Sequence, residues 1–218
     1  MFRTTLALGL VVGLLHPVPS GAQPGPVGAK PNVAPMVCGP DRLTVVYQRD
    51  VARVTFRDQT FEMKQVPAAS GAKYEVEGDP TTSFWNKGRN GTLTIKGTAY
   101  PECTPAVTVA NLRGAVWVVD AIAGAAPVAD SRVTLDFGAQ GRFAGNASCN
   151  GMRGTYTANP DGLSVSPLAT TRKACPPPLM AQEQTVVALL GQVRSAQITP
   201  EGALVLYAAD GRTITARR

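Results

Sequence analysis

The sequence predicts a mainly β protein with two small antiparallel β-barrel domains, the second packed by one α-helix. Three observations predict this fold class. The 218 residues suffice for two domains of roughly 80 to 110 residues each. Short apolar runs alternate with turn residues along most of the chain, which contains 22 Gly and 18 Pro. The four cysteines fall two in each half, which allows one bridge per domain.

The N-terminal 22 residues have the pattern of a secretory signal peptide. Arg3 precedes an apolar run over residues 6–15, and the small residues Ser20-Gly21-Ala22 follow. The run has about half of the roughly 20 apolar residues that a membrane span needs, so no membrane span is expected. No lipid-anchor cysteine follows the run closely, because the first cysteine is Cys38. These features predict a periplasmic or secreted protein.

Residues 23–36 are rich in Pro, Gly and Ala and show no periodicity, which predicts a flexible linker. A barrel domain is expected over residues 37–105. Its strands are predicted where apolar residues recur between turn signals such as Ser70-Gly71 and Asn90-Gly91. The predicted strands are residues 43–47, 51–56, 61–66, 73–77, 82–85 and 92–96.

A second domain is expected over residues 112–218. Its strands are predicted at residues 115–119, 132–137, 155–156, 163–165, 203–207 and 212–216, with a turn at residues 159–162. One helix interrupts them: Pro177-Pro178 suits a helix start. Leu179, Val186, Leu190 and Val193 form one apolar stripe at helical spacing.

The cysteines Cys38, Cys103, Cys149 and Cys175 are expected to form disulfides, because exported thiols usually oxidise. Of the three possible connectivities, we expect the one that keeps each bridge inside one half, Cys38–Cys103 and Cys149–Cys175. No Cys-x-x-Cys spacing indicates a metal site. We therefore expect neither a metal nor a cofactor.

The chain contains one histidine, His16, which lies in the expected signal peptide. The mature protein then has no histidine for Ser-His-Asp or Cys-His catalysis. The net charge of +6 is spread out: residues 31–110 contain nine Lys/Arg and eight Asp/Glu, and residues 111–218 contain ten and seven. Without a clustered basic patch, nucleic-acid binding is not expected.

Ser70-Gly-Ala-Lys73 matches the S-x-x-K motif of penicillin-recognising enzymes, in which a serine nucleophile lies one helical turn from its lysine base. The surroundings argue against an enzyme. Ser-Gly is a turn signal between two predicted strands, and no S-D-N motif follows. The serine hydrolase stays an alternative that covalent labelling of Ser70 would test.

A second interpretation accounts for more of the chain around Ser70. Residues 36–105 resemble the MliC/PliC family of C-type lysozyme inhibitors. The resemblance rests on five features in order: Cys38, Leu43-Thr44-Val45, Ser70-Gly71-Ala72-Lys73-Tyr74, Phe84-Trp85-Asn86-Lys87-Gly88 and Cys103. It implies a small β-barrel closed by Cys38–Cys103, whose loops enter the lysozyme cleft.

The resemblance also implies which residues bind lysozyme. Ser70 and Lys87 match the positions that reach the catalytic carboxylates, while Gly71 and Tyr74 shape the loop. We expect Phe84 and Trp85 to pack inside the barrel rather than contact the partner. The chain departs from the family pattern at Met36, where an aromatic residue is usual, and at Gly78-Asp79-Pro80, which lengthens the stretch between Tyr74 and Phe84.

Residues 112–217 resemble the META domain of HslJ-like envelope proteins. The matching features are Trp117, Gly145-Asn-Ala-Ser-Cys149-Asn150, Thr171-Arg172-Lys173-Ala174-Cys175-Pro176, Met180 with Glu183, and Leu204–Leu206 before Asp210-Gly211. The resemblance implies an envelope or stress role and names no partner. Asn150, Arg172 and Glu183 could line a site, but we expect them to make structural hydrogen bonds.

Two functions of different classes follow. The first is an exported inhibitor of C-type lysozyme fused to a META domain, a binding protein and not an enzyme. The alternative is a non-inhibitory envelope stress or structural protein that binds cell-wall or surface components, which the extra Gly78-Asp79-Pro80 favours.

Overall fold

The computed structural model describes residues 32–159 and 162–218. The predicted signal peptide, residues 23–31 of the predicted linker and the centre of the turn at residues 159–162 lie outside the described residues. Strands make up 56% of the described residues, and they form two barrel-like sheets, one closed and one nearly closed. The mainly β fold with two barrels is therefore confirmed. The described residues belong to one compact unit, so the division into two domains stays a prediction.

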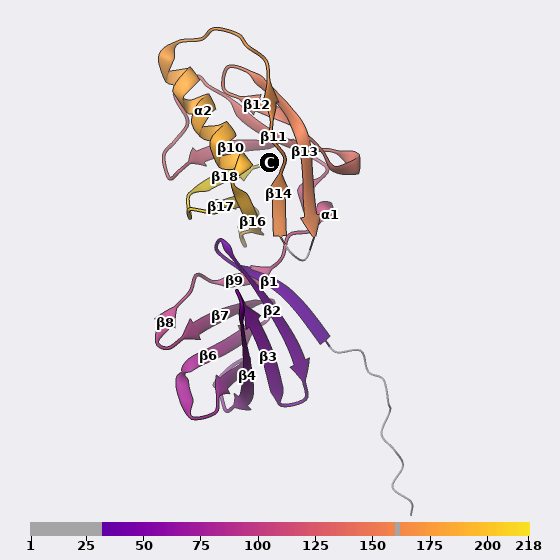
Figure 1. Ribbon diagram of the computed structural model, residues 1–218, viewed down its shortest axis with the longest axis vertical. Coiled ribbons are helices and arrows are strands. Elements are labelled where there is room, and N and C mark those ends of the chain that lie inside the picture. Colours follow the sequence, from indigo (N-terminus) through magenta and orange to yellow (C-terminus); the bar gives the residue numbers. More distant parts are fainter. Residues whose placement is uncertain (1–31, 160–161) are drawn as a thin grey trace, which may run out of the picture. The chain divides into compact units, whose positions relative to one another are not determined.

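The first sheet is a closed antiparallel ring, drawn in indigo to magenta in Figure 1. Neighbouring strands along the chain pair in order, β9 joins β1 to β7, and β6 pairs with β7 to complete the ring; β8 lies outside it. Its strands are β1 (Asn32–Cys38), β2 (Asp41–Gln48), β3 (Val51–Phe56), β4 (Gln59–Val66), β5 (Ala72–Val76), β6 (Asp79–Lys87), β7 (Asn90–Ile95), β8 (Thr98–Ala99) and β9 (Cys103–Pro105).

The core of this ring follows from the two-residue period of its strands. In β3, for example, Ala52, Val54 and Phe56 are buried and the residues between them face outward. A disulfide joins Cys38 of β1 to Cys103 of β9, which are paired in register. The bridge therefore ties together the first and last strands of the ring.

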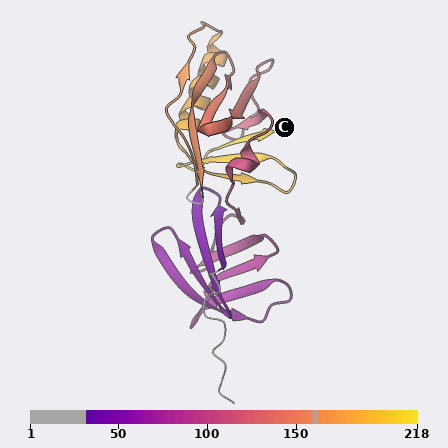
Figure 2. The same cartoon turned by 90° about the vertical axis from the view of Figure 1, so that its right-hand side faces the viewer.

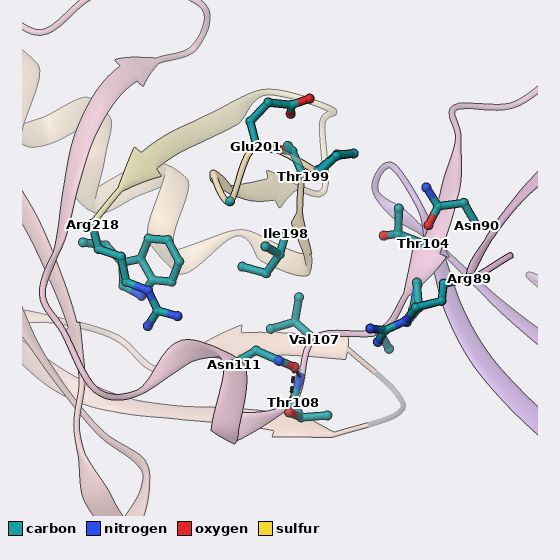
Figure 3. A pocket seen from close by; sticks show the side chains of 15 residues that line it. Arg89, Asn90, Thr104, Val107, Thr108, Asn111, Ile198, Thr199, Glu201 and Arg218 are labelled. Carbon is teal, nitrogen blue, oxygen red and sulfur yellow. Dashed lines mark hydrogen bonds between the residues drawn. The ribbon is translucent and has the colours of Figure 1, made fainter.

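After the ring comes the short helix α1 (Val109–Leu112), whose N-cap residue is Thr108. The backbone N–H and the hydroxyl of Thr108 donate to Asn111 Oδ1, at 2.9 and 2.7 Å. Figure 3 marks the contact between these two residues with dashed lines. At the chain's other end, the Arg218 guanidinium lies 4.5 Å from the centroid of the Trp117 ring.

The second sheet is nearly closed, because its end strands β14 and β16 contact each other without strand pairing. Its strands are β10 (Trp117–Ile122), β11 (Val133–Phe137), β12 (Arg142–Ala147), β13 (Gly151–Asn159), β14 (Gly162–Val165), β15 (Ala169–Thr170), β16 (Val193–Ile198), β17 (Leu204–Ala208) and β18 (Thr213–Arg217), with a 3-10 turn at Ala139–Gly141. The second disulfide, Cys149–Cys175, lies within this half.

Helix α2 (Pro177–Gly191) packs against this second sheet and is the coiled ribbon in Figures 1 and 2. It begins with a proline at its first position, as predicted. Val186 and Leu190 of the predicted stripe are buried. Val193, however, is the first residue of β16 and not part of the helix.

Two further expectations are corrected. Residues 32–36, placed in the linker, belong to β1, where Met36 is already buried against the core. The turn expected at Asn90-Gly91 lies two residues earlier, at Gly88-Arg89, and Asn90 and Gly91 begin β7.

Candidate functional site

The predicted contact residues lie around one end of the β5–β6 hairpin. Residues 67–71 connect β4 to β5, and Ala72 then pairs with Asn86 near the end of β6. Lys87 is the last residue of β6. The structure therefore brings Ser70, Gly71 and Lys87 together at the same edge of the barrel.

Gly71 allows this close approach. Its φ is +66°, and a Cβ there would lie 2.2 Å from the Asn86 carbonyl oxygen and 3.2 Å from Lys87 Cγ. A residue with a side chain would both be strained in this left-handed conformation and collide with the neighbouring strand. The glycine of the Ser-Gly pair thus lets the loop backbone lie directly against β6.

Lys87 is held at the start of a tight turn. It pairs with Asn90 across the two-residue turn Gly88-Arg89, in which Gly88 has a φ of +62°. A positive φ at the first central position is typical of the primed turns that join antiparallel strands. This geometry places the Lys87 side chain on the surface beside the 67–71 loop.

Trp85 connects the two contact residues, and this differs from the expectation that it packs inside the barrel. Phe84 is fully buried, but the half-buried Trp85 faces outward because successive strand residues alternate. Its indole N–H donates to the Ser70 carbonyl oxygen at 2.8 Å. The Lys87 Nζ lies 3.7 Å from the centroid of the Trp85 ring.

Tyr74 supports the loop from inside. It pairs with Phe84 across the hairpin, is 6% exposed, and its ring centroid lies 5.8 Å from that of Tyr47. The Asn86 amide donates to the Tyr47 hydroxyl at 3.2 Å. Burial raises the pKa of both tyrosines, so both hydroxyls stay protonated near neutral pH. With so little exposed surface, Tyr74 can shape the site but offers almost no surface to a partner.

The charged groups of the site are unequally paired. Lys73 forms an ion pair with Glu75, with Nζ and Oε1 2.7 Å apart. Among the described residues, by contrast, Lys87 has no carboxylate partner and the Ser70 hydroxyl has no hydrogen bond. The site therefore presents an ammonium and a hydroxyl that a partner's acceptors can use.

The same geometry bears on the S-x-x-K interpretation. Ser70 lies in a bend and Lys73 in strand β5, so the helical turn that joins nucleophile and base in that motif is missing. The Lys73 ammonium is also engaged by Glu75. These residues are not arranged for acylation.

The extra Gly78-Asp79-Pro80 lies at the opposite end of the hairpin from Ser70. Val76 pairs with Asp79, so the turn is Glu77-Gly78 and the added residues lengthen the hairpin. Four strand residues, about 13 Å, separate Val76 from Ala72 at the site. The added residues therefore lie away from Ser70 and Lys87.

Asn150 and Glu183 of the second half meet in a buried hydrogen-bond network. The Asn150 amide donates to the Glu183 carboxylate at 3.0 Å and to the Lys173 carbonyl at 3.2 Å, and its Oδ1 accepts bonds from Thr171 and the Lys173 N–H. The network anchors the segment before Cys175 to α2. Arg172 is exposed and contributes no bond to it.

A hollow elsewhere on the chain is drawn in Figure 3. It is lined by Arg89, Thr104, Glu201 and Arg218 among others, and the described residues that line it include none of the four predicted contact residues. Within residues 32–159 and 162–218, no group of three or more His, Cys, Asp or Glu side chains is arranged to hold a metal ion. Nor does that part of the chain contain a helix long and apolar enough to cross a membrane.

These features define a disulfide-bonded, two-barrel protein of the extracytoplasmic type. Residues 110–218, half of the chain, match the family model described as META domain. The chain therefore belongs to this family. Residues 37–101 match the family model described as membrane-bound lysozyme-inhibitor of c-type lysozyme, MliC. Both are non-catalytic families.

Two NMR structures are similar to this chain. One is the structure of a protein from Burkholderia xenovorans, which is 27% identical to this chain, with a TM-score of 0.43. The match covers 50% of this chain and 85% of the Burkholderia chain. The other structure is 24% identical to this chain, with a TM-score of 0.44. The match covers 51% of this chain and 94% of the other protein's chain. No curated protein matches the chain.

Proposed function

We propose that this protein is an exported inhibitor of C-type lysozyme that blocks the active-site cleft with Ser70 and Lys87. The observation that carries the proposal lies at one exposed edge of the barrel. Within the described part of the chain, the Lys87 ammonium there has no carboxylate partner and the nearby Ser70 hydroxyl has no hydrogen bond. The MliC family to which the first half is matched supports the choice of partner.

The chemistry of the target fits these two groups. Lysozyme cleaves glycosidic bonds with two carboxyl groups, which in retaining enzymes lie about 5–5.5 Å apart. An ammonium ion can pair with a carboxylate, and a hydroxyl can donate a hydrogen bond to a neighbouring one. An inserted Lys87 and Ser70 would occupy both groups and exclude the sugar without any reaction.

Affinity must come from this local fit. Residues 31–110 carry nine basic and eight acidic side chains, so this half has almost no net charge to steer it onto its partner. Association is then expected at an ordinary rate, with tight binding expressed as slow dissociation.

The test is an inhibition constant against a C-type lysozyme. Lys87→Ala leaves a desolvated enzyme carboxylate unpaired, which typically costs about 2–5 kcal/mol, or roughly 30- to 4,000-fold in affinity. Ser70→Ala removes a hydrogen bond to a charged group and costs about 1.5–3 kcal/mol, roughly 10- to 150-fold.

Lys73→Ala is the matched control, because Lys73 lies on the same hairpin but its charge is already paired with Glu75. Its inhibition should stay within about twofold of wild type, and thermal melting would verify that all variants fold. A wild-type protein that does not inhibit, or folded Lys87→Ala and Ser70→Ala variants that inhibit as well as wild type, would contradict the proposal.

We also propose that the chain functions in the periplasm or after secretion and that the META domain serves the cell envelope under stress. The disulfide within each half supports an oxidising compartment. Cell fractionation with thiol labelling tests the location: the protein should appear outside the cytoplasm with no reactive thiol.

A further inference from the structure

We propose that Trp85 is a positioning residue that fixes Ser70 and Lys87 in their binding arrangement before any partner arrives. The positions of Ser70 and Lys87 on Trp85 are a property of the free protein. The effect of Trp85 on inhibition rests on the proposed function.

The indole uses two different parts for its two contacts. Its N–H edge donates to the Ser70 carbonyl oxygen at 2.8 Å, which fixes the backbone of the loop at that residue. Its π face lies under the Lys87 ammonium, 3.7 Å from Nζ to the ring centroid. The first contact is a hydrogen bond and the second a cation–π interaction, so both can exist at once.

The strand geometry favours both contacts. Trp85 and Lys87 are two residues apart on β6 and therefore face the same side of the sheet. The loop reaches the indole because Gly71 lets the loop backbone lie against Asn86. The two contact residues come from different segments, and the Trp85 side chain touches both.

Lys73 does not compete for the same ring face. It is paired with Trp85 across the hairpin, but its ammonium is held by Glu75 at 2.7 Å. Glu75 thus engages the Lys73 ammonium, and Lys87 is the cation that lies over the Trp85 ring.

Because Trp85 orders Lys87 and the Ser70 loop before binding, less conformational entropy is lost when the complex forms. A free lysine side chain samples many rotamers and loses them when it is buried in an interface. A lysine already resting on an aromatic ring has less to lose, and a loop already bonded at Ser70 presents its hydroxyl from a fixed backbone. Removing Trp85 should therefore weaken inhibition although Trp85 need not touch the partner.

The first experiment examines the free protein by proton NMR. The Lys87 side-chain protons next to Nζ should be shifted upfield by the Trp85 ring current, whereas those of Lys73 should not. Trp85→Phe keeps an aromatic face and should retain part of the shift; Trp85→Leu should abolish it. Lys87 protons at the ordinary lysine position in the wild type would overturn the inference.

The indole N–H gives a second readout from the same sample. The chain has two tryptophans, and the N–H of the buried Trp117 donates to the Leu112 carbonyl at 2.9 Å, which supplies a slowly exchanging reference. The Trp85 N–H should exchange more slowly than a freely exposed indole. Exchange at the free rate would overturn the contact with Ser70.

The second experiment is a double-mutant cycle on the inhibition constant. The hydrogen bond and the cation–π contact together correspond to roughly a 5- to 60-fold loss for Trp85→Leu. In a Lys87→Ala background the same change should cost several-fold less, since one of its two contacts is already gone. Equal losses in both backgrounds would refute positioning of Lys87.

The two proposals fail separately. If the NMR signatures are present but the wild type does not inhibit, the proposed function is wrong and the placement by Trp85 stands. If the wild type inhibits but Trp85→Leu inhibits equally well with an unchanged Lys87 signal, the positioning is wrong and the proposed function stands.

Discussion

The substitution Gly71→Ala tests the geometry of the site most directly. Gly71 has a φ of +66°, and an added Cβ would lie 2.2 Å from the Asn86 carbonyl oxygen. The new methyl group therefore meets rigid strand backbone and not a side chain that can rotate away. The loop must move off β6, and the hydrogen bond from Trp85 to the Ser70 carbonyl is expected to break.

Gly78→Ala is the matched control for the size of the stability loss. Gly78 has a φ of +79° in the turn at the other end of the same hairpin, and a Cβ there would meet nothing within 4 Å. This variant bears only the cost of a left-handed alanine, roughly 1–2 kcal/mol. Gly71→Ala bears the same cost plus the broken hydrogen bond of roughly 0.5–1.5 kcal/mol.

The assay is denaturant unfolding combined with the inhibition constant. Gly71→Ala should lower the free energy of unfolding by about 1.5–3.5 kcal/mol and weaken inhibition by at least tenfold, whereas Gly78→Ala should lower only the stability. Equal stability losses with an unchanged Trp85 indole exchange rate would refute the close approach at Gly71. Loss of inhibition in Gly78→Ala would refute the placement of the site at one end of the hairpin.

Three further predictions concern stability. Replacing Cys149 and Cys175 by serine opens a 26-residue loop and should cost roughly 3.5 kcal/mol, measured by denaturant unfolding against the wild type. Asn150→Ala removes the side-chain bonds to Glu183 and the Lys173 backbone and should cost roughly 3 kcal/mol by the same measurement. Hydrogen bonds from Thr81 and Thr82 lower the pKa of Asp79. Its contribution is thus present above the unfolded-state pKa and lost as pH falls through the lower folded-state pKa. Asp79→Asn should destabilise the protein at pH 6, and pH-dependent thermal melting should show the difference vanish in acid.

Much of the first barrel could be predicted from the sequence, because its strands alternate and their turns contain Gly or Asp. The strand at residues 51–56 is an example: β3 has the predicted bounds. The start of β1 could not be predicted. Residues 32–36 contain one proline and no alternation. They form a strand because each of them pairs with β2, and β9 pairs with the other edge of β1 from Met36 onward.

The end of helix α2 shows a second limit. Val193 continues the apolar stripe of the helix in the sequence, yet it begins β16. Gly191 and Gln192 end the helix, and Val193 then pairs with Ala208 of β17. Both a helix and a strand bury a valine at this position, so periodicity alone cannot choose between them; the partner strand decides.

The position of Trp85 could have been inferred from the sequence by the same alternation. Phe84 and Trp85 are neighbours in one strand, so they cannot both face the barrel interior. Phe84 shares the inward face with Thr82, and both are buried. Trp85 must then face outward together with Lys87, which places a large aromatic ring and an ammonium on one exposed face.

An outward tryptophan needs cover for its apolar surface and a partner for its N–H. In this chain Lys87 lies over the ring and the Ser70 carbonyl accepts the N–H bond. The identity of that acceptor could not be predicted, since it depends on how closely Gly71 lets the loop approach β6.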